Sequence, residues 1–184
     1  AADSVFVEAQ EMTMTRPTTL VDIKSRCHVD TITGCWNWRG AVSISNNGIT
    51  MQTSAVLSSA AAVLFKTTSN SITLQSAAQL SSTGANVVLE AEDSISLAAN
   101  SLVSASVADL ILRSGLDSTD GTGSMTLDGT LQTPAAGKTV TLDLNDEQGA
   151  TQNTTTGRIL APNLRLLSNS TNTASFSLLA GTRN

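Results

Sequence analysis

An apolar pattern recurs at a fixed interval along the middle of the chain. Ile49, Ile72 and Ile95 open three successive 23-residue windows, and each is followed by Thr or Ser and a further apolar residue. The same spacing relates two more sets: Met51, Leu74 and Leu97, and Leu57, Leu80 and Val103. A period of roughly 20 to 50 residues is typical of repeat proteins, in which each unit buries its apolar side only against the next unit.

Within each unit, apolar residues alternate with Ser or Thr, as in ITM, ITL and ISL. Alternation with period two predicts short strands, and the Asn, Gly, Ser and Asp between them tolerate tight turns. Three short strands per window describe one coil, and coils stack about 4.8 Å apart. We therefore predict an all-β fold, a right-handed parallel β-helix (β-solenoid) with about 23 residues per coil, the hand following the general crossover preference.

The third strand of each coil is predicted from Leu64, Val87 and Leu110, with Leu89 aligned to Leu112. A polar insertion, DSTDGTGS, follows Leu116 and shifts the register before the pattern resumes, which gives five to seven coils. The residues expected to carry the stability form an aliphatic core: Ile49, Ile72, Ile95, Leu74, Leu97, Leu89 and Leu112.

Residues 1 to 40 lack the repeat and are predicted to form an N-terminal cap or assembly segment, with the β-solenoid over 41 to 184. Open solenoid ends expose unpaired strands, so caps are expected. The sequence stops after FSLLAGTRN with little that resembles a cap. This indicates a cut solenoid, a partner over that end, or a longer parent protein.

The predicted cap holds both cysteines and both tryptophans. Cys27 and Cys35 enclose a short loop and predict a disulfide, since exported proteins keep such bonds. A metal site that adds His28 is disfavoured, because adjacent Cys and His do not easily reach one tetrahedral ion. Trp36 and Trp38 share one side of an extended strand and are interpreted as a cover for the first coil, with glycan contact as the alternative.

Composition leaves little material for catalysis. The chain has one histidine and 3% aromatic residues, which disfavours His-based chemistry and stacking platforms. Ten Lys and Arg lie scattered among fifteen Asp and Glu, so no basic stripe exists for a phosphate backbone. The longest apolar run, from Ala60 to Phe65, is too short to span a membrane. We expect no catalytic residue, cofactor, metal, nucleic-acid partner or membrane span.

Hydroxyl residues form columns on the outward side of the predicted strands. The main column is Thr50, Thr73, Ser96 and Thr126, flanked by Ser71, Ser94 and Ser124. Such rows occur on ice-binding solenoids, but small polar residues also make any β-helix soluble. A solvated surface is the favoured interpretation, and ice binding is the alternative.

A polysaccharide lyase would need clustered carboxylates beside a Lys or Arg base. Lys66, Arg113 and Lys138 are judged not to line up with acidic residues in the 23-residue frame, which disfavours this enzyme class. Asn153 and Asn169 begin glycosylation sequons, which matter only in a eukaryotic source.

Residues 41 to 184, with strings such as NVVLEAEDSISLAAN, resemble the filamentous-haemagglutinin type of β-helix exoprotein. The ITL and VVLEA strings are also similar to those of bacteriophage tail and decoration proteins. Both resemblances imply a structural or adhesive role. Cys35, Trp36, Trp38 and Gly40 resemble the opening of phage HNH endonucleases, but the later metal-binding histidines of that family are absent here.

The sequence thus predicts a non-enzymatic extracellular structural or adhesive β-solenoid, a subunit or segment of a surface filament or adhesin. Its expected location is extracellular, on the cell surface or in a virion. We expect self-association or a larger protein assembly, with a host-surface glycan as a further partner. The alternatives are a bacteriophage tail-fibre or capsid-decoration protein, and an ice-binding or glycan-binding solenoid.

Overall fold

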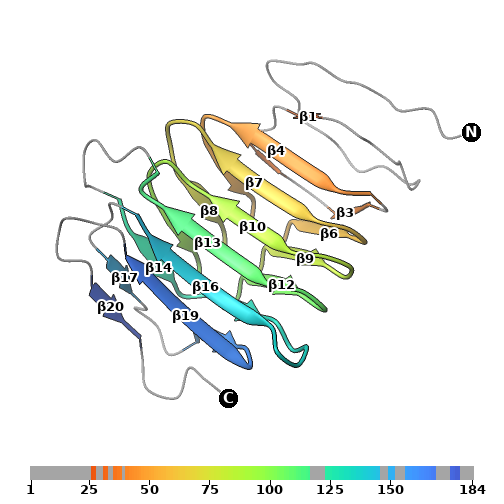
Figure 1. Ribbon diagram of the computed structural model, residues 1–184. Coiled ribbons are helices and arrows are strands. Elements are labelled where there is room, and N and C mark those ends of the chain that lie inside the picture. The colour runs from red at the N-terminus through yellow and green to blue at the C-terminus, as the bar shows by residue number, and fades with distance from the viewer. Residues whose placement is uncertain are drawn as a thin grey trace, which may run out of the picture.

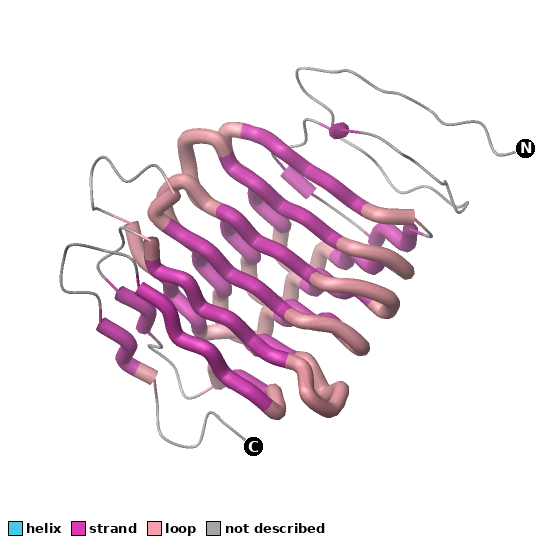
Figure 2. The backbone as a smooth tube through the Cα atoms, in the orientation of Figure 1, coloured by secondary structure: helices cyan, strands magenta, loops and turns pink. Residues whose placement is uncertain are grey.

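Short parallel strands stack in three sheets to form a β-solenoid (Figures 1 and 2). The computed structural model describes residues 26–27, 31–32, 35–38, 40–116, 123–145, 149–151, 156–168 and 175–178. This part of the chain contains no helix and makes about five turns of about 24 residues each. The predicted all-β parallel solenoid is therefore confirmed, and its hand stays a prediction.

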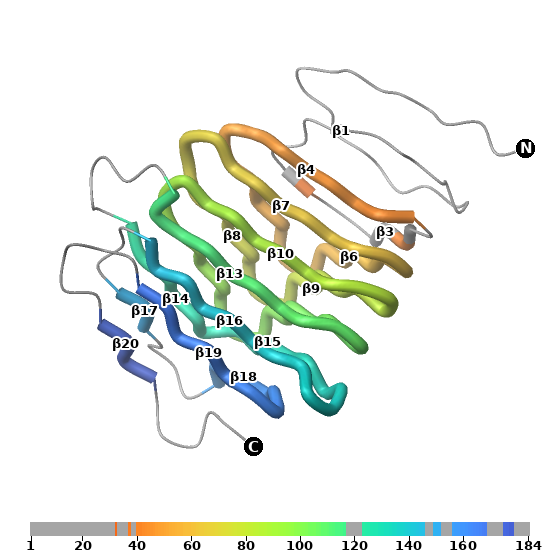
Figure 3. The backbone as a smooth tube through the Cα atoms, in the orientation of Figure 1, coloured from red at the N-terminus to blue at the C-terminus, as the bar shows by residue number. Residues whose placement is uncertain are grey.

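Each sheet takes one strand from every coil, so its neighbours come from successive coils, as the colour gradient of Figure 3 shows. Sheet A contains β1 (Arg26–Cys27), β4 (Val42–Asn46), β7 (Val63–Thr67), β10 (Val87–Glu90), β13 (Leu110–Ser114), β16 (Thr139–Leu144) and β19 (Asn163–Ser168). Sheet B contains β2 (Thr31–Ile32), β5 (Ile49–Met51), β8 (Ile72–Leu74), β11 (Ile95–Leu97), β14 (Met125–Leu127), β17 (Gly149–Thr151) and β20 (Ser175–Ser177). Sheet C contains β3 (Cys35–Trp38), β6 (Val56–Ser59), β9 (Gln79–Ser82), β12 (Leu102–Ala105), β15 (Thr130–Gln132) and β18 (Arg158–Leu160).

The 23-residue spacing is the register between coils. Ile49 pairs with Ile72, and Ile72 pairs with Ile95, in neighbouring parallel strands. Every residue of the predicted aliphatic core is buried with 0% exposure: Ile49, Ile72, Ile95, Leu74, Leu97, Leu89 and Leu112. Apolar residues at alternate positions therefore pack into one continuous core along the solenoid axis.

One predicted alignment is wrong by a residue. Val63, not Leu64, pairs with Val87, so the step between these two coils is longer than the repeat predicts. Phe65 is buried at 0% exposure while Leu64 is half-buried on the outward side. Three consecutive apolar residues, V-L-F, offer no alternation from which to choose the inward pair, and a one-residue slip reverses which side each faces.

The predicted insertion after Leu116 lengthens one coil without interrupting the stack. Ile95 pairs with Met125 and Leu110 pairs with Val140, both across a 30-residue step. All four side chains are buried at 0% exposure. The register shift predicted from the sequence is therefore confirmed, and residues 117–122 of the insertion lie outside the described residues.

Stacking begins before the predicted domain boundary at residue 40. Strands β1, β2 and β3 lie within the first 40 residues and pair in parallel with β4, β5 and β6. Ile32 on β2 is buried with 4% exposure and belongs to the core. Residues 26–27, 31–32 and 35–38 thus contribute strands to the solenoid, and residues 1–25, 28–30, 33–34 and 39 of the predicted cap lie outside the described residues.

Hydroxyl groups at the corner between sheets C and A join three of the coils to the one before, whereas β12 has Ala105 at this position. In each case a buried side-chain hydroxyl donates to a backbone carbonyl of the preceding turn. The bonds run from Ser59 to Gly40 (2.7 Å), from Ser82 to Ala61 (2.6 Å) and from Thr133 to Ala108 (2.7 Å). The coils approach so closely here that a Cβ on Gly84 would lie 2.1 Å from the Ala60 oxygen.

The corner between sheets B and C uses a left-handed residue that is not glycine. Ser54, Ala77 and Asn100 occupy equivalent places with φ of 60°, 58° and 64°. In the turn before β9, the backbone N–H of Ala78 donates to the Gln75 carbonyl over 3.0 Å. A positive φ at the third residue of such a turn is the type II geometry, which favours glycine.

We predict that Ala77→Gly stabilises the protein. A left-handed alanine costs about 1–2 kcal/mol, and glycine removes that cost while adding about 0.5–1 kcal/mol of unfolded-chain entropy. The net gain of roughly 0.5–1 kcal/mol is measured by denaturant unfolding. Ala78→Gly, at a buried position with ordinary φ, is the control and lowers stability. Destabilisation by Ala77→Gly would contradict the assigned turn.

We predict that Leu89→Asp unfolds or aggregates the chain. The Leu89 side chain has 0% exposure, so a carboxylate there would lie in the aliphatic core without a partner. Ser81→Asp, at an outward position of β9, is the matched control and stays folded. A soluble Leu89→Asp variant with the parent melting curve, followed by circular dichroism, would show that Leu89 does not lie in the core.

Candidate functional site

The outward surface of sheet B carries one continuous column of hydroxyl residues. The predicted members pair in succession, Thr50 with Thr73, Thr73 with Ser96 and Ser96 with Thr126. The backbone pairing extends the column with two residues that the sequence reasoning missed, Thr151 and Ser177, and the backbone of Thr31 on β2 lies in the same register. Those additions were hidden because the steps to them differ from the period of the central repeat.

Strand length limits this surface to a single column. The four predicted members lie at the middle of three-residue strands whose outer two residues are buried. Each of those strands therefore exposes one side chain, about 4.8 Å from the next along the solenoid. The result is a narrow, flat row of half-buried hydroxyls.

The flanking serines are engaged within the protein. The Ser71 hydroxyl donates to Asp93 Oδ2 over 2.9 Å and accepts the backbone N–H of Ser94 over 3.3 Å. The Ser94 hydroxyl donates to Asp93 Oδ1 over 3.0 Å and accepts the backbone N–H of Ser124 over 2.9 Å. Ser71 and Ser94 thus connect three coils through their hydroxyl groups, which makes them structural rather than free surface donors.

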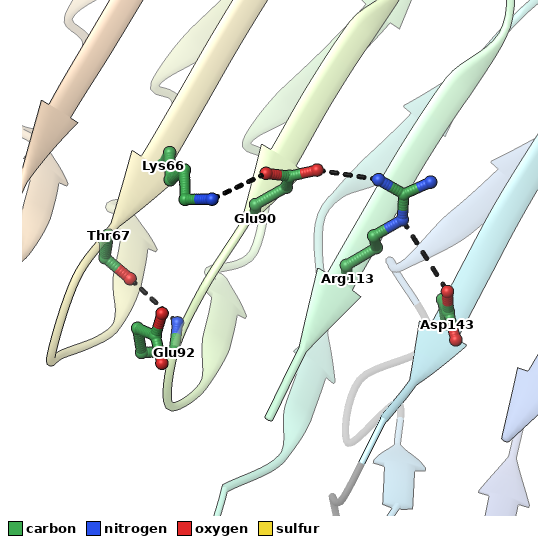
Figure 4. A network of polar contacts seen from close by, with 6 residues as sticks. All are labelled: Lys66, Thr67, Glu90, Glu92, Arg113 and Asp143. Atoms are coloured by element: carbon green, nitrogen blue, oxygen red, sulfur yellow. Dashed lines mark hydrogen bonds and ion pairs between the residues drawn. The ribbon is translucent and has the colours of Figure 1, made fainter. Parts of the chain in front are cut away.

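A second polar arrangement crosses the outward surface of sheet A. Lys66, Glu90, Arg113 and Asp143 pair in register on β7, β10, β13 and β16, and we call them the ion-pair row (Figure 4). Glu90 lies 3.6 Å from Lys66 Nζ and 2.7 Å from Arg113 Nη1. Arg113 Nε lies 3.6 Å from Asp143 Oδ2. Opposite charges therefore alternate over four coils.

This row corrects the sequence interpretation that Lys66 and Arg113 do not line up with acidic residues. Glu90 and Arg113 are separated by one full repeat and pair directly. Lys66 joins them through the longer step between β7 and β10, and Asp143 through the coil that contains the insertion. Variable coil lengths move the two ends of the row out of the 23-residue frame, whereas the central pair of Glu90 and Arg113 lies within it.

The backbone of the cysteine and tryptophan segment is described, but these four side chains are not. Cys27 pairs in register with buried Ile44 in sheet A, whereas Cys35 pairs with half-buried Val56 in sheet C. The described residues contain no disulfide, so the Cys27–Cys35 bond stays a prediction. Trp36 and Trp38 pair with Leu57 and Ser59, both buried, and the interpretation of the two tryptophans as a cover or a glycan contact stays a prediction.

The last described coil leaves inward positions partly open. On β16, Val140, Leu142 and Leu144 are buried at 0% exposure. Their partners on β19 are Leu164, Leu166 and Ser168, and Leu166 is 41% exposed. Leu164, Phe176 and Leu178 pack against the core but are only partly buried. Within the described coils, the apolar core therefore reaches solvent at this end.

Several sequence features fall outside the described residues, including Asn153 and Asn169. Among the residues that are described, no group of three or more His, Cys, Asp or Glu side chains gathers as a metal site would. That same part of the chain holds no helix long and apolar enough to cross a membrane.

Comparisons of the chain with family models, curated proteins and solved structures found no match.

Proposed function

We propose that this chain is a non-enzymatic structural or adhesive β-solenoid that acts outside the cell as a subunit or segment of a surface filament. The carrying observation is the exposed apolar surface of the last described strands, β18, β19 and β20. Within the described residues these strands are the last of their sheets. At this end an inward leucine, Leu166, keeps 41% of its surface exposed.

The exposed apolar surface of this coil favours packing of another coil against it. Covering exposed apolar surface contributes roughly 25 cal/mol per Å². An added coil also pairs its strands with edge strands through backbone N–H and C=O groups. A contact between unlike ends repeats without closing and produces a filament, so both effects support end-to-end assembly.

The surface chemistry supports a role outside the cell. Charged residues make up 14% of the chain, below the roughly one quarter typical of soluble domains. Ser and Thr side chains occupy most outward positions of sheet B instead. A hydroxyl-covered rod is well suited to a solvated filament that contacts other surfaces through many weak hydrogen bonds.

The hydroxyl column favours a second candidate function, binding of a flat periodic surface such as ice. Every strand of the seven-stranded sheet B contributes Thr or Ser in this register, so the column is longer than the sequence predicted. The hydroxyl groups repeat about every 4.8 Å along the solenoid axis, but a single column has no repeat across that axis. The single column is the reason that this candidate ranks second.

We predict that the protein forms end-to-end oligomers that lengthen with concentration, and that Leu166→Lys stops this growth. An ammonium at the open core end opposes burial against another coil. Leu167→Lys is the matched control, because it places the same charge one residue along β19 on the opposite side. Mass photometry and negative-stain imaging measure the lengths. A chain that stays monomeric at all concentrations would contradict the filament role.

For the second candidate, we predict inhibition of ice recrystallisation that Thr73→Lys abolishes, since a long cation interrupts the flat column. Ser104→Lys, at an outward position on sheet C, is the control and keeps the parent activity. If the parent protein does not inhibit ice recrystallisation, the ice-binding function is wrong. If both variants lose the inhibition, the hydroxyl column is not the site that binds ice.

A further inference from the structure

The outward surface of sheet A differs in chemistry from that of sheet B. Beside the ion-pair row lies an aliphatic column, formed by Leu64, Val88 and Ile111 in three successive coils. Thr141 continues this column on β16. We call the two columns together the sheet A face. The equivalent outward positions on sheet B are hydroxyl residues, so the fold itself does not require aliphatic side chains there.

The charges of the ion-pair row alternate in sign, so reversing the order of the coils changes the sign at every position. Across β7, β10, β13 and β16 they run positive, negative, positive, negative (Figure 4). Read in the opposite direction, the same row runs negative, positive, negative, positive. A copy laid over it with its coils in the opposite order therefore presents an opposite charge to every member.

We propose that the sheet A face binds the same face of a second copy, with the two solenoid axes antiparallel. The two-fold axis lies along the strands, between β10 and β13. Lys66 then faces Asp143 of the second copy, and Glu90 faces its Arg113. In the adjacent column, Val88 faces Ile111, and Leu64 faces Thr141. This lateral pairing goes beyond the proposed end-to-end assembly and uses different residues.

Exposure of the cations suits this role. The side chains of Lys66 and Arg113 are 45% and 40% exposed, although both contact carboxylates of their own chain. Glu90 and Asp143 are less exposed, at 17% and 16%. The cations thus stand further from the sheet and are available to a second carboxylate. A parallel copy in the same register would instead oppose like charges, which costs affinity and favours the antiparallel arrangement.

The area indicates a weak contact. The four strands that carry the two columns, about 4.8 Å apart and about five residues long, make a face of roughly 300 Å² per copy. The total of about 600 Å² lies below the roughly 1,000 Å² of stable specific interfaces, so pairing is expected only at high protein concentration. The aliphatic column lies beside the charges, so apolar burial supplies affinity and the charges supply orientation.

A charge-reversal cycle tests this arrangement in the full chain carrying Leu166→Lys, which blocks end-to-end growth. Lys66→Glu and Asp143→Lys each oppose like charges across the interface, and each is expected to weaken dimerisation about tenfold or more. The double variant restores opposite charges between copies and is expected to recover the parent dissociation constant to within about threefold. Sedimentation velocity over a concentration series measures the constants.

The cycle separates contacts between copies from contacts within one chain. Lys66 and Asp143 lie on β7 and β16, with β10 and β13 between them in sheet A, so they do not compensate each other inside one molecule. A double variant that loses more affinity than either single variant overturns the proposal. A parent protein without dimers also overturns it, while filament growth in the chain without Leu166→Lys would still support the proposed function.

Crosslinking provides a second test that does not depend on reversed charges. In the antiparallel pair, Leu64→Cys faces Thr141→Cys of the other copy, and the two positions are too far apart to react within one chain. The double cysteine variant is expected to form covalent dimers above the parent baseline set by Cys27 and Cys35. Each single cysteine variant is expected to stay at that baseline. Dimers from Leu64→Cys alone would indicate a parallel pair and overturn the proposal.

Discussion

Register between coils is the constraint on which the structure depends. Parallel strands of successive coils must align so that apolar side chains point inward at every level, and a slip of one residue would reverse all of them. Hydrogen bonds across the sheets fix the spacing, and core residues such as Ile72 and Leu89 fix the phase. Changes in coil length therefore leave the pairing register intact, as the long step between Ile95 and Met125 shows.

The same constraint explains how much could be predicted from the sequence. Columns of identical spacing, such as Ile49, Ile72 and Ile95, establish strand, period and core together. Prediction fails where alternation disappears, as at Leu64, and where a step departs from the repeat, as for Thr151 and Ser177. The ion-pair row needed two such steps to reach Lys66 and Asp143. Repetition predicts the interior well because packing repeats, whereas surface columns depend on each coil length.

Stacking of the coils turns single outward residues into continuous surface columns. One outward residue contributes little by itself, but stacking places its equivalents about 4.8 Å apart in a straight line. Sheet B repeats one chemistry, the hydroxyl, and so has the same character in either direction. Sheet A alternates charge, so its row has a direction, and a second copy recognises it only when reversed. The two surfaces thus differ in polarity, and they also differ in whether they fix the orientation of a second copy.

Lateral and end-to-end contacts place different demands on the same coils. End-to-end growth requires an exposed inward residue such as Leu166, and its strength comes from covering the core. Lateral pairing requires outward residues that already have partners in their own chain, so it changes stability little when it is lost. Antiparallel pairing would also turn the β19 ends of two copies in opposite directions. A filament built from such pairs would have no net polarity and would grow equally from both ends, whereas single stacked copies would grow as polar rods.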